Sequence, residues 1–205
     1  MIVVVDYGMG NLRSVSKALE HLGAKVKVSS SSADIARADK VVVPGVGAFG
    51  DAARELERLG LKEPLREFVW NKKPFLGICL GLQLLFDESE ESPGQKGLGL
   101  FPGRVRLFPS GEVKVPHMGW NSVHLRFAHP LLAGVREGSY FYFVHSYYAD
   151  PAEASVTAAS CTYGDRTFTA ILGTGNVFAT QFHPEKSQSA GLAILKNFIA
   201  WEPVR

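Results

Sequence analysis

The chain has 205 residues, and its 22 Lys and Arg against 20 Asp and Glu give a net charge of +2. With 46 % hydrophobic and 20 % charged residues, it has the composition of a globular domain rather than a disordered or fibrous chain. The near-neutral charge argues against nucleic-acid binding, and two cysteines do not form a disulfide scaffold. We expect one domain, residues 1–205, in the cytoplasm and without a signal peptide or a membrane span.

Short β-rich runs alternate with helical patterns through the first part of the chain. Leu12, Val15, Leu19 and Leu22 recur at helical spacing after Asn11, which is suited to cap a helix. Strands separated by helices at such intervals favour a parallel sheet with helices on both faces. The expected strands cover residues 2–5, 25–28, 40–43 and 75–78. The expected helices cover 12–22, 51–70 with an interruption before Pro64, and a segment that opens with Leu80, Leu84 and Leu85.

From about residue 104 the pattern changes to one β run after another, with a brief helical turn near Leu131 and a final amphipathic helix over 191–201. We expect this half to add antiparallel strands to the sheet. The predicted fold class is therefore α/β: a single domain with a mixed, mostly parallel sheet and helices on both faces. The expected strands of this half are 105–108, 123–125, 140–144, 156–161, 167–172 and 177–182.

A glycine-rich loop at residues 45–50 matches G-x-G-x-x-G between an expected strand and an expected helix. This pattern is typical of dinucleotide-binding proteins, but Pro44 precedes the loop and the next strand ends in Cys79 instead of an acidic residue. A tight turn is a second interpretation. The third is a loop whose backbone N–H groups face a ligand or an oxyanion, which glycine permits because it lacks a Cβ atom.

Gly77-Ile78-Cys79-Leu80-Gly81 has the pattern of a nucleophile elbow at a strand-to-helix junction, with cysteine as the nucleophile. Small residues on either side of Cys79 are needed where such a turn crowds its neighbours. The following helix would favour the thiolate through its N-terminal dipole, and the N–H of Leu80 would face a developing oxyanion. The alternative is that Cys79 is a buried core residue, the usual position of a free cysteine.

His183-Pro184-Glu185 supplies a candidate base and a residue to orient it. His183 ends an expected strand, where residues two apart project to the same side, and Pro184 favours an extended conformation at His183. Glu185 could then accept from one ring nitrogen while the other faces the thiol. No His or Cys spacing is typical of a metal site, and Cys161 is interpreted as core packing.

The elbow, continued by residues 82–86, and the segment 181–185 resemble the class I (triad) glutamine amidotransferases. These α/β proteins hydrolyse glutamine to glutamate and ammonia. Residues 6–11, 44–49, 115–121 and 143–148 further resemble the glutaminase subunits of histidine biosynthesis. The resemblance runs from residue 6 to about residue 187 and departs at Leu82, where methionine is common, and at Ala179-Thr180.

This resemblance implies that Cys79 attacks L-glutamine and forms a thioester, His183 carries the proton to ammonia, and Glu185 orients His183, without cofactor or metal. The implied oxyanion hole consists of the backbone N–H groups of Val46, Gly47 and Leu80. The implied glutamine-binding residues are Gly45, Gln83, Glu91, His145, Ser146 and Tyr147.

The resemblance also implies a heterodimer in which ammonia passes to a (β/α)₈ cyclase subunit. We expect the peptide at Gly45–Gly47 to reorient when that partner carries its ligand, because glycine lowers the cost of such a rotation. The alternatives are a glutaminase of another synthase (vitamin B6 or anthranilate pathway), a dinucleotide-binding module, and a catalytically silent partner protein. The implied partner-facing residues are Asn11, Met118, Trp120 and Lys186.

Overall fold

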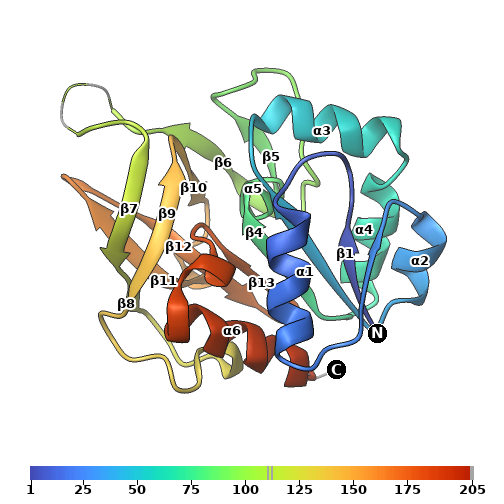
Figure 1. The fold of residues 1–205 in the computed structure, drawn as a ribbon. Helices are drawn as coiled ribbons and strands as arrows, with labels where there is room; N and C mark the ends of the chain where they lie inside the picture. The colour runs from blue at the N-terminus through green and yellow to red at the C-terminus, as the bar shows by residue number, and fades with distance from the viewer. Residues whose placement is uncertain (110, 112, 204–205) are drawn as a thin grey trace.

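An eight-stranded sheet forms the centre of the computed structural model, which describes residues 1–109, 111 and 113–203 (Figure 1). The strand order is β2-β1-β3-β4-β13-β12-β11-β8. The first five strands in this order are parallel: β2 (Val26–Ser29), β1 (Ile2–Val5), β3 (Lys40–Gly45), β4 (Phe75–Cys79) and β13 (Val177–Thr180). Antiparallel pairing adds β12 (Arg166–Thr174), β11 (Thr157–Tyr163) and β8 (His124–Leu125).

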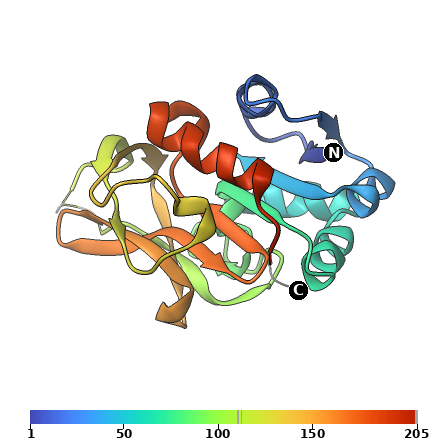
Figure 2. The same cartoon turned by 90° about the horizontal axis from the view of Figure 1, so that it is seen from below.

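Helices cover both faces of this sheet, because its inner strands are apolar on both sides. In β1, Val4 belongs to one hydrophobic core, whereas Val3 and Val5 belong to the other. Figure 2 shows the dark blue α1 and the red α6 on the same side. The expected mixed sheet with helices on both faces is confirmed. The first face holds α1 (Leu12–His21) and α6 (Gln188–Ala200), and the other holds α2 (Ser32–Arg37), α3 (Phe49–Arg58) and α4 (Lys62–Trp70).

Two smaller sheets lie beside the central one. They contain runs that were predicted to belong to the central sheet, so that part of the prediction is wrong. The runs 105–108 and 140–144 were expected to join the main sheet, but they fall in these additional sheets. Alternation of side chains predicts a strand without identifying its partner, and these pairings join residues far apart in the chain. One sheet has the order β10-β6-β5, with β10 (Tyr147–Pro151), β6 (Phe101–Leu107) and β5 (Phe86–Ser89); the other pairs β7 (His117–Ser122) with β9 (Tyr140–His145).

The expected interruption before Pro64 is confirmed, since α3 ends at Arg58 and α4 begins at Lys62. The helix expected to open at Leu80 is wrong in length, because α5 (Leu80–Gln83) is a single turn. The chain leaves the helix where the carbonyl oxygens of Leu84 and Leu85 accept backbone hydrogen bonds from Leu98 and Leu100, at 2.7 and 2.8 Å. No helix in the described residues is both long and apolar enough to cross a membrane.

Candidate active site

Cys79 occupies a strained turn at the carboxyl end of β4. Its φ of 56° and ψ of −106° lie in a region that residues with a Cβ atom rarely adopt. The flanking glycines are required by space: a Cβ at Gly81 would lie 1.9 Å from the Val43 carbonyl oxygen, and one at Gly77 would lie 2.7 Å from the Gly81 carbonyl oxygen. Backbone strain of this kind is found at functional sites, where the surrounding packing maintains it.

The helix that follows Cys79 contributes less than the sequence suggested. A single turn contains few aligned peptide dipoles, so α5 is a weak source of stabilisation for a thiolate. Other groups near the sulfur must supply most of it. The second cysteine has no comparable position, because Cys161 is fully buried in the core and burial raises the pKa of its thiol to about 12.

His183 and Glu185 form a buried pair beside the elbow. Nδ1 of His183 lies 2.9 Å from Oε1 of Glu185, and the two side chains are 3 % and 0 % exposed. The expected extended conformation is present at His183, but Glu185 lies in a short 3₁₀ turn (η3, Pro184–Lys186), so the turn rather than strand alternation brings the two side chains together. The predicted pair is confirmed, but the predicted geometry is wrong.

The pairing determines the charge on His183. Burial lowers the pKa of this imidazole, but the nearby Cys79 sulfur and the hydrogen-bonded Glu185 carboxylate outweigh burial and raise the pKa to about 10. The ring therefore carries its proton at neutral pH, beside the Cys79 sulfur. Among the described residues, Nε2 of His183 has no hydrogen-bond partner. This nitrogen is therefore left for Cys79 and a substrate.

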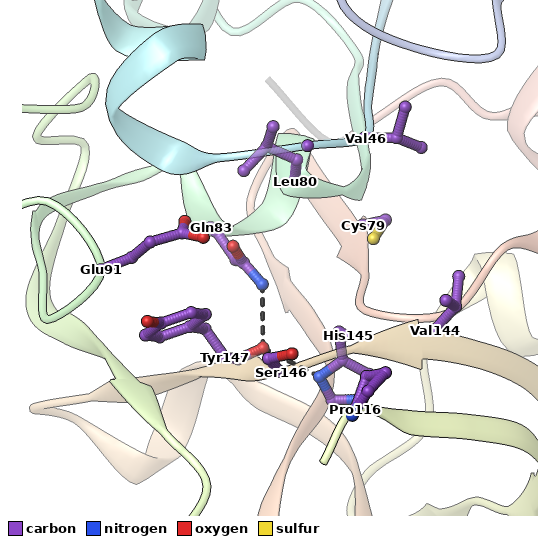
Figure 3. A pocket seen from close by; sticks show the side chains of 11 residues that line it. Val46, Cys79, Leu80, Gln83, Glu91, Pro116, Val144, His145, Ser146 and Tyr147 are labelled. Carbon is purple, nitrogen blue, oxygen red and sulfur yellow. Dashed lines mark hydrogen bonds between the residues drawn. The ribbon is translucent and has the colours of Figure 1, made fainter.

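A cavity of about 390 Å³ opens at the Cys79 sulfur (Figure 3). Loops at the ends of β3 and β4 form one wall, and the segment joining β9 to β10 forms the other. All but one of the residues expected to bind glutamine or its oxyanion line this cavity. The exception, Gly45, directly precedes the lining residue Val46 in the chain. The lining residues are Val46, Gly47, Cys79, Leu80, Gln83, Glu91, Pro116, Val144, His145, Ser146 and Tyr147.

Three of the polar lining residues have hydrogen bonds that limit what each can offer a ligand. Gln83 donates through Nε2 to the Tyr147 carbonyl oxygen at 2.9 Å, as Figure 3 shows, which leaves its Oε1 for a ligand. Glu91 accepts from the Phe49 N–H at 2.6 Å through Oε2 and retains its second oxygen. Both ring nitrogens of His145 are already hydrogen-bonded, so its contact with a ligand would come from the backbone.

The glycine loop after β3 is packed tightly against the elbow and against Tyr7. A Cβ at Gly45 would lie 2.3 Å from the Tyr7 hydroxyl and 2.7 Å from the Leu80 Cβ. Tyr7 donates to the Pro44 carbonyl oxygen at 2.8 Å, and burial, with the nearby Cys79 charge, raises its pKa. The sequence argument did not assign Tyr7, although its place in the turn after the first strand could have suggested a role.

The dinucleotide interpretation of this loop is disfavoured by the same region. In a dinucleotide site, the helix after the loop directs free N–H groups at phosphate. Here α3 offers its first N–H groups to Glu91 and to the Ser92 hydroxyl, and a carboxylate in that position repels phosphate. A Cβ at Gly50 would lie 2.5 Å from Ser92 Oγ, so internal packing accounts for this glycine.

The expected partner-facing residues have different surroundings. Met118 and Trp120 are 63 % and 46 % exposed on β7, and the Trp120 ring lies 6.1 Å from that of Tyr142 on β9. Lys186 extends over the same Tyr142 ring, with Nζ 5.9 Å from its centre. Asn11 caps α1 by accepting from the Ser14 N–H, which gives it a structural role of its own.

Three lining or neighbouring residues were not predicted: Pro116, Val144 and Gln181. Pro116 and Val144 lie within segments that carried the family resemblance, which was the available signal. Gln181 also lies within such a segment, residues 181–185, although no residue-level pattern assigned it a role. Within the part of the chain that the structure describes, no cluster of three His, Cys, Asp or Glu side chains could hold a metal ion.

Curated proteins named "Imidazole glycerol phosphate synthase subunit HisH" resemble this chain over nearly its whole length. The protein from Syntrophotalea carbinolica is 55 % identical over 204 residues, covering 97 % of this chain and 98 % of the relative. The protein from Nitrosospira multiformis is 52 % identical over 213 residues, covering 99 % of each. The archaeal relative from Methanosarcina acetivorans is 52 % identical over 199 residues, covering 97 % of each.

Among solved structures, one described as "Crystal structure of glutamine amidotransferase" matches with a TM-score of 0.75 at 21 % identity and covers 97 % of this chain and 99 % of its own. At that identity the likeness shows a shared fold. Residues 3–201 match the family model described as "Glutamine amidotransferase class-I". The chain therefore belongs to the class I glutamine amidotransferase family.

Proposed function

We propose that this protein is the glutaminase subunit of an imidazole glycerol phosphate synthase, which hydrolyses L-glutamine and delivers ammonia for histidine biosynthesis. The single observation that carries this proposal is the strained Cys79 facing a cavity, with the buried His183–Glu185 pair beside it. The names and near-complete coverage of the relatives support the choice of synthase.

In the first step, the Cys79 thiolate attacks the side-chain carboxamide carbon of glutamine. His183 is protonated in the resting pair, so it can give its proton to the departing ammonia as the tetrahedral intermediate collapses to a thioester. Glu185 accepts from Nδ1 and thereby holds Nε2 toward the reacting atoms. The now neutral imidazole then takes a proton from water, which attacks the thioester and releases glutamate.

The developing oxyanion would be met by the backbone N–H of Leu80 and one from the loop at Val46 and Gly47. These residues line the cavity with Cys79, and the loop is held from behind by Tyr7 through the Pro44 carbonyl. Rigid backbone donors of this kind stabilise the transition state more than the substrate. The change of orientation expected with the liganded partner would be confined to the peptide at Gly47, whose φ of 101° is easily adopted only by glycine.

The substrate's amino-acid end would bind at the opposite end of the cavity from the elbow. The free oxygens of Gln83 and Glu91 suit an α-ammonium group, and the Ser146 hydroxyl and the Tyr147 backbone suit the remaining polar groups. Gly45 allows close approach of the substrate to the β3 backbone. These assignments agree with a small zwitterion as the ligand.

The partner would be a (β/α)₈ cyclase that uses ammonia to make imidazole glycerol phosphate and AICAR. Its docking surface would be the outer side of the β7–β9 ribbon, where the exposed Met118 and Trp120 lie next to Tyr142 and Lys186. Large apolar side chains grouped on a polar surface are typical of interfaces. The ribbon also borders the cavity at Val144, so ammonia would leave Cys79 close to the partner.

The test is glutamate release from glutamine by the wild type and by Cys79→Ala, each with and without a cyclase subunit carrying its nucleotide substrate. We expect Cys79→Ala to lose about 10⁴-fold or more in rate, because no other described side chain can form the thioester. The wild type should be faster with the liganded partner. Undiminished glutamate release by Cys79→Ala would contradict the mechanism.

Supplying anthranilate-type or vitamin B6-type synthase subunits in place of the cyclase tests the choice of pathway. Stimulation by either of those, and none by the cyclase, would favour the other glutaminase assignments. Equal rates with and without the liganded cyclase would overturn the proposed change at Gly45–Gly47 while leaving the hydrolysis mechanism intact.

A further inference from the structure

A buried carboxamide that the mechanism has not used contacts the nucleophile. Gln181, which follows β13, is fully buried, and its Nε2 lies 3.8 Å from the Cys79 sulfur. Burying an amide group costs free energy unless its N–H and C=O groups form hydrogen bonds. The side chain is therefore held there by defined partners, and the direction of its hydrogen bonds determines what it does to the sulfur.

The orientation of the Gln181 amide follows from its neighbours. The carbonyl oxygen of Tyr147 is an acceptor only, so the Gln83 atom 2.9 Å from it must be the NH₂ group. That NH₂ group also donates to Oε1 of Gln181 at 3.2 Å. Because Oε1 of Gln181 accepts from Gln83, the NH₂ group of Gln181 is the end directed at Cys79.

The Tyr147 carbonyl oxygen, which fixes this orientation, also accepts the last hydrogen bond of a chain that runs from Asn121 through His117 and His145. Nδ1 of His145 donates to it at 2.8 Å, so Nε2 of His145 accepts from Nδ1 of His117 at 2.9 Å, and Nε2 of His117 accepts from Asn121 at 3.2 Å. Burial lowers the pKa of His117 to about 4 and that of His145 to about 3. Both rings are therefore neutral near neutral pH, so the donors and acceptors along this chain of hydrogen bonds keep their roles.

We propose that Gln181 donates a neutral N–H to the Cys79 thiolate, stabilising the anion and holding the sulfur toward the cavity. This inference rests on the proposed function only in taking Cys79 as the reactive group. Because α5 is too short to contribute much, a second donor beside His183 would add to the stabilisation of the thiolate. When the sulfur bonds to the substrate carbon, its charge moves to the oxyanion and the Gln181 donor releases it.

Two titratable side chains from other parts of the site also act on Cys79, and a third, Glu185, acts on it through His183. His183 and Glu185 follow β13, and Tyr7 follows β1. His183 is the proton carrier, whereas Tyr7 donates its hydroxyl to Pro44. Gln181 differs from all three because it has no proton to gain or lose, so its effect on the thiolate is present at every pH.

The test is the rate at which iodoacetamide alkylates Cys79, measured from about pH 5 to about pH 10 without glutamine or partner. Peptide mass spectrometry separates Cys79 from Cys161, and Cys79→Ala gives the background. We expect Gln181→Met, which has a similar length and no donor, to move the midpoint of the profile upward by about one pH unit. Gln181→Asn, which retracts the amide by one methylene, should shift it in the same direction.

Asn176 offers a matched control at the other end of β13. It is a buried carboxamide that donates only to the backbone carbonyls of Val69 and Lys73, far from the elbow. Asn176→Leu should lower stability but leave the alkylation profile unchanged.

Profiles of the two Gln181 variants within about 0.2 pH units of the wild type would overturn the proposal, as would an equal shift in Asn176→Leu. If Gln181→Met does not fold, Gln181→Asn decides. Failure of the glutamine assay in the wild type, with the alkylation shift intact, would contradict the proposed function and not this inference.

Discussion

The carboxyl ends of β3 and β4 and the β7–β9 ribbon both border the cavity, but they are built in different ways. At β3 and β4, neighbouring parallel strands end in turns whose glycines are required by contacts of less than 3 Å to a hypothetical Cβ. The ribbon instead pairs His117–Ser122 with Tyr140–His145, and its outer side exposes Met118, Trp120 and Tyr140. The first region fixes the backbone around Cys79 by close packing. The second has exposed apolar side chains on its outer side and the hydrogen-bonded His117 and His145 on its inner side.

Because the two regions are built differently, substitutions in them should have different effects. Changes at the strand ends should alter catalysis or folding in the isolated chain. Changes on the outer side of the ribbon should leave the isolated chain intact and affect the partner. The following predictions test that separation, from the largest expected effect to the smallest.

Glu185→Gln should reduce the glutaminase rate by about 10²-fold or more, because the charge that favours protonated His183 is lost. In the wild type, His183 is protonated below about pH 10, so the rate should fall as the pH rises through that value. Removing the Glu185 charge lowers the pKa of His183, and the alkaline limb of kcat/KM should move to lower pH.

The matched control for Glu185→Gln is Glu137→Gln. Glu137 lies 2.8 Å from Nδ1 of His124 in the same kind of pair, but both side chains are more than half exposed and far from the cavity. An alkaline limb that stays in place in Glu185→Gln, or that moves equally in both variants, would show that the buried pair does not set the proton on His183.

Gly81→Ala should lower the free energy of unfolding by about 3 kcal/mol or more, because its Cβ would meet a backbone carbonyl rather than a movable side chain. The control is Gly60→Ala, where a Cβ meets open space and only the φ of 64° is unfavourable. That control should cost about 1 kcal/mol. Urea unfolding measures both, and equal losses would mean that the elbow is less crowded than its geometry indicates.

Trp120→Ala should weaken binding of the cyclase by about 2 kcal/mol, or about 30-fold in Kd, with little change in stability. Trp70 on α4 is 62 % exposed, so Trp70→Ala is a control of the same chemistry on the other side of the molecule. Titration of each variant against the partner gives the comparison. A loss of affinity in Trp70→Ala equal to that in Trp120→Ala would contradict the assignment of the ribbon as the docking surface.

Errors in the sequence prediction arose where distant segments meet. The helix after Cys79 ended early because residues 98–101 supplied the backbone partners of Leu84 and Leu85. That competition has no local pattern, since Leu98 and Leu100 lie more than ten residues further along the chain.

The sequence by itself determined the alternation of strands and helices, the elbow glycines around Cys79 and the pair of His183 with Glu185. The first two features depend on periodicity and on backbone sterics, and the third depends on the short turn at Pro184–Lys186. All three act between residues close together in the chain. Only the tertiary structure decided that β7 and β9 form a separate ribbon, that Tyr7 holds the Pro44 carbonyl, and that Gln181 directs its N–H at the sulfur. Those contacts depend on which surfaces meet after the chain has folded, and a one-dimensional pattern does not contain that information.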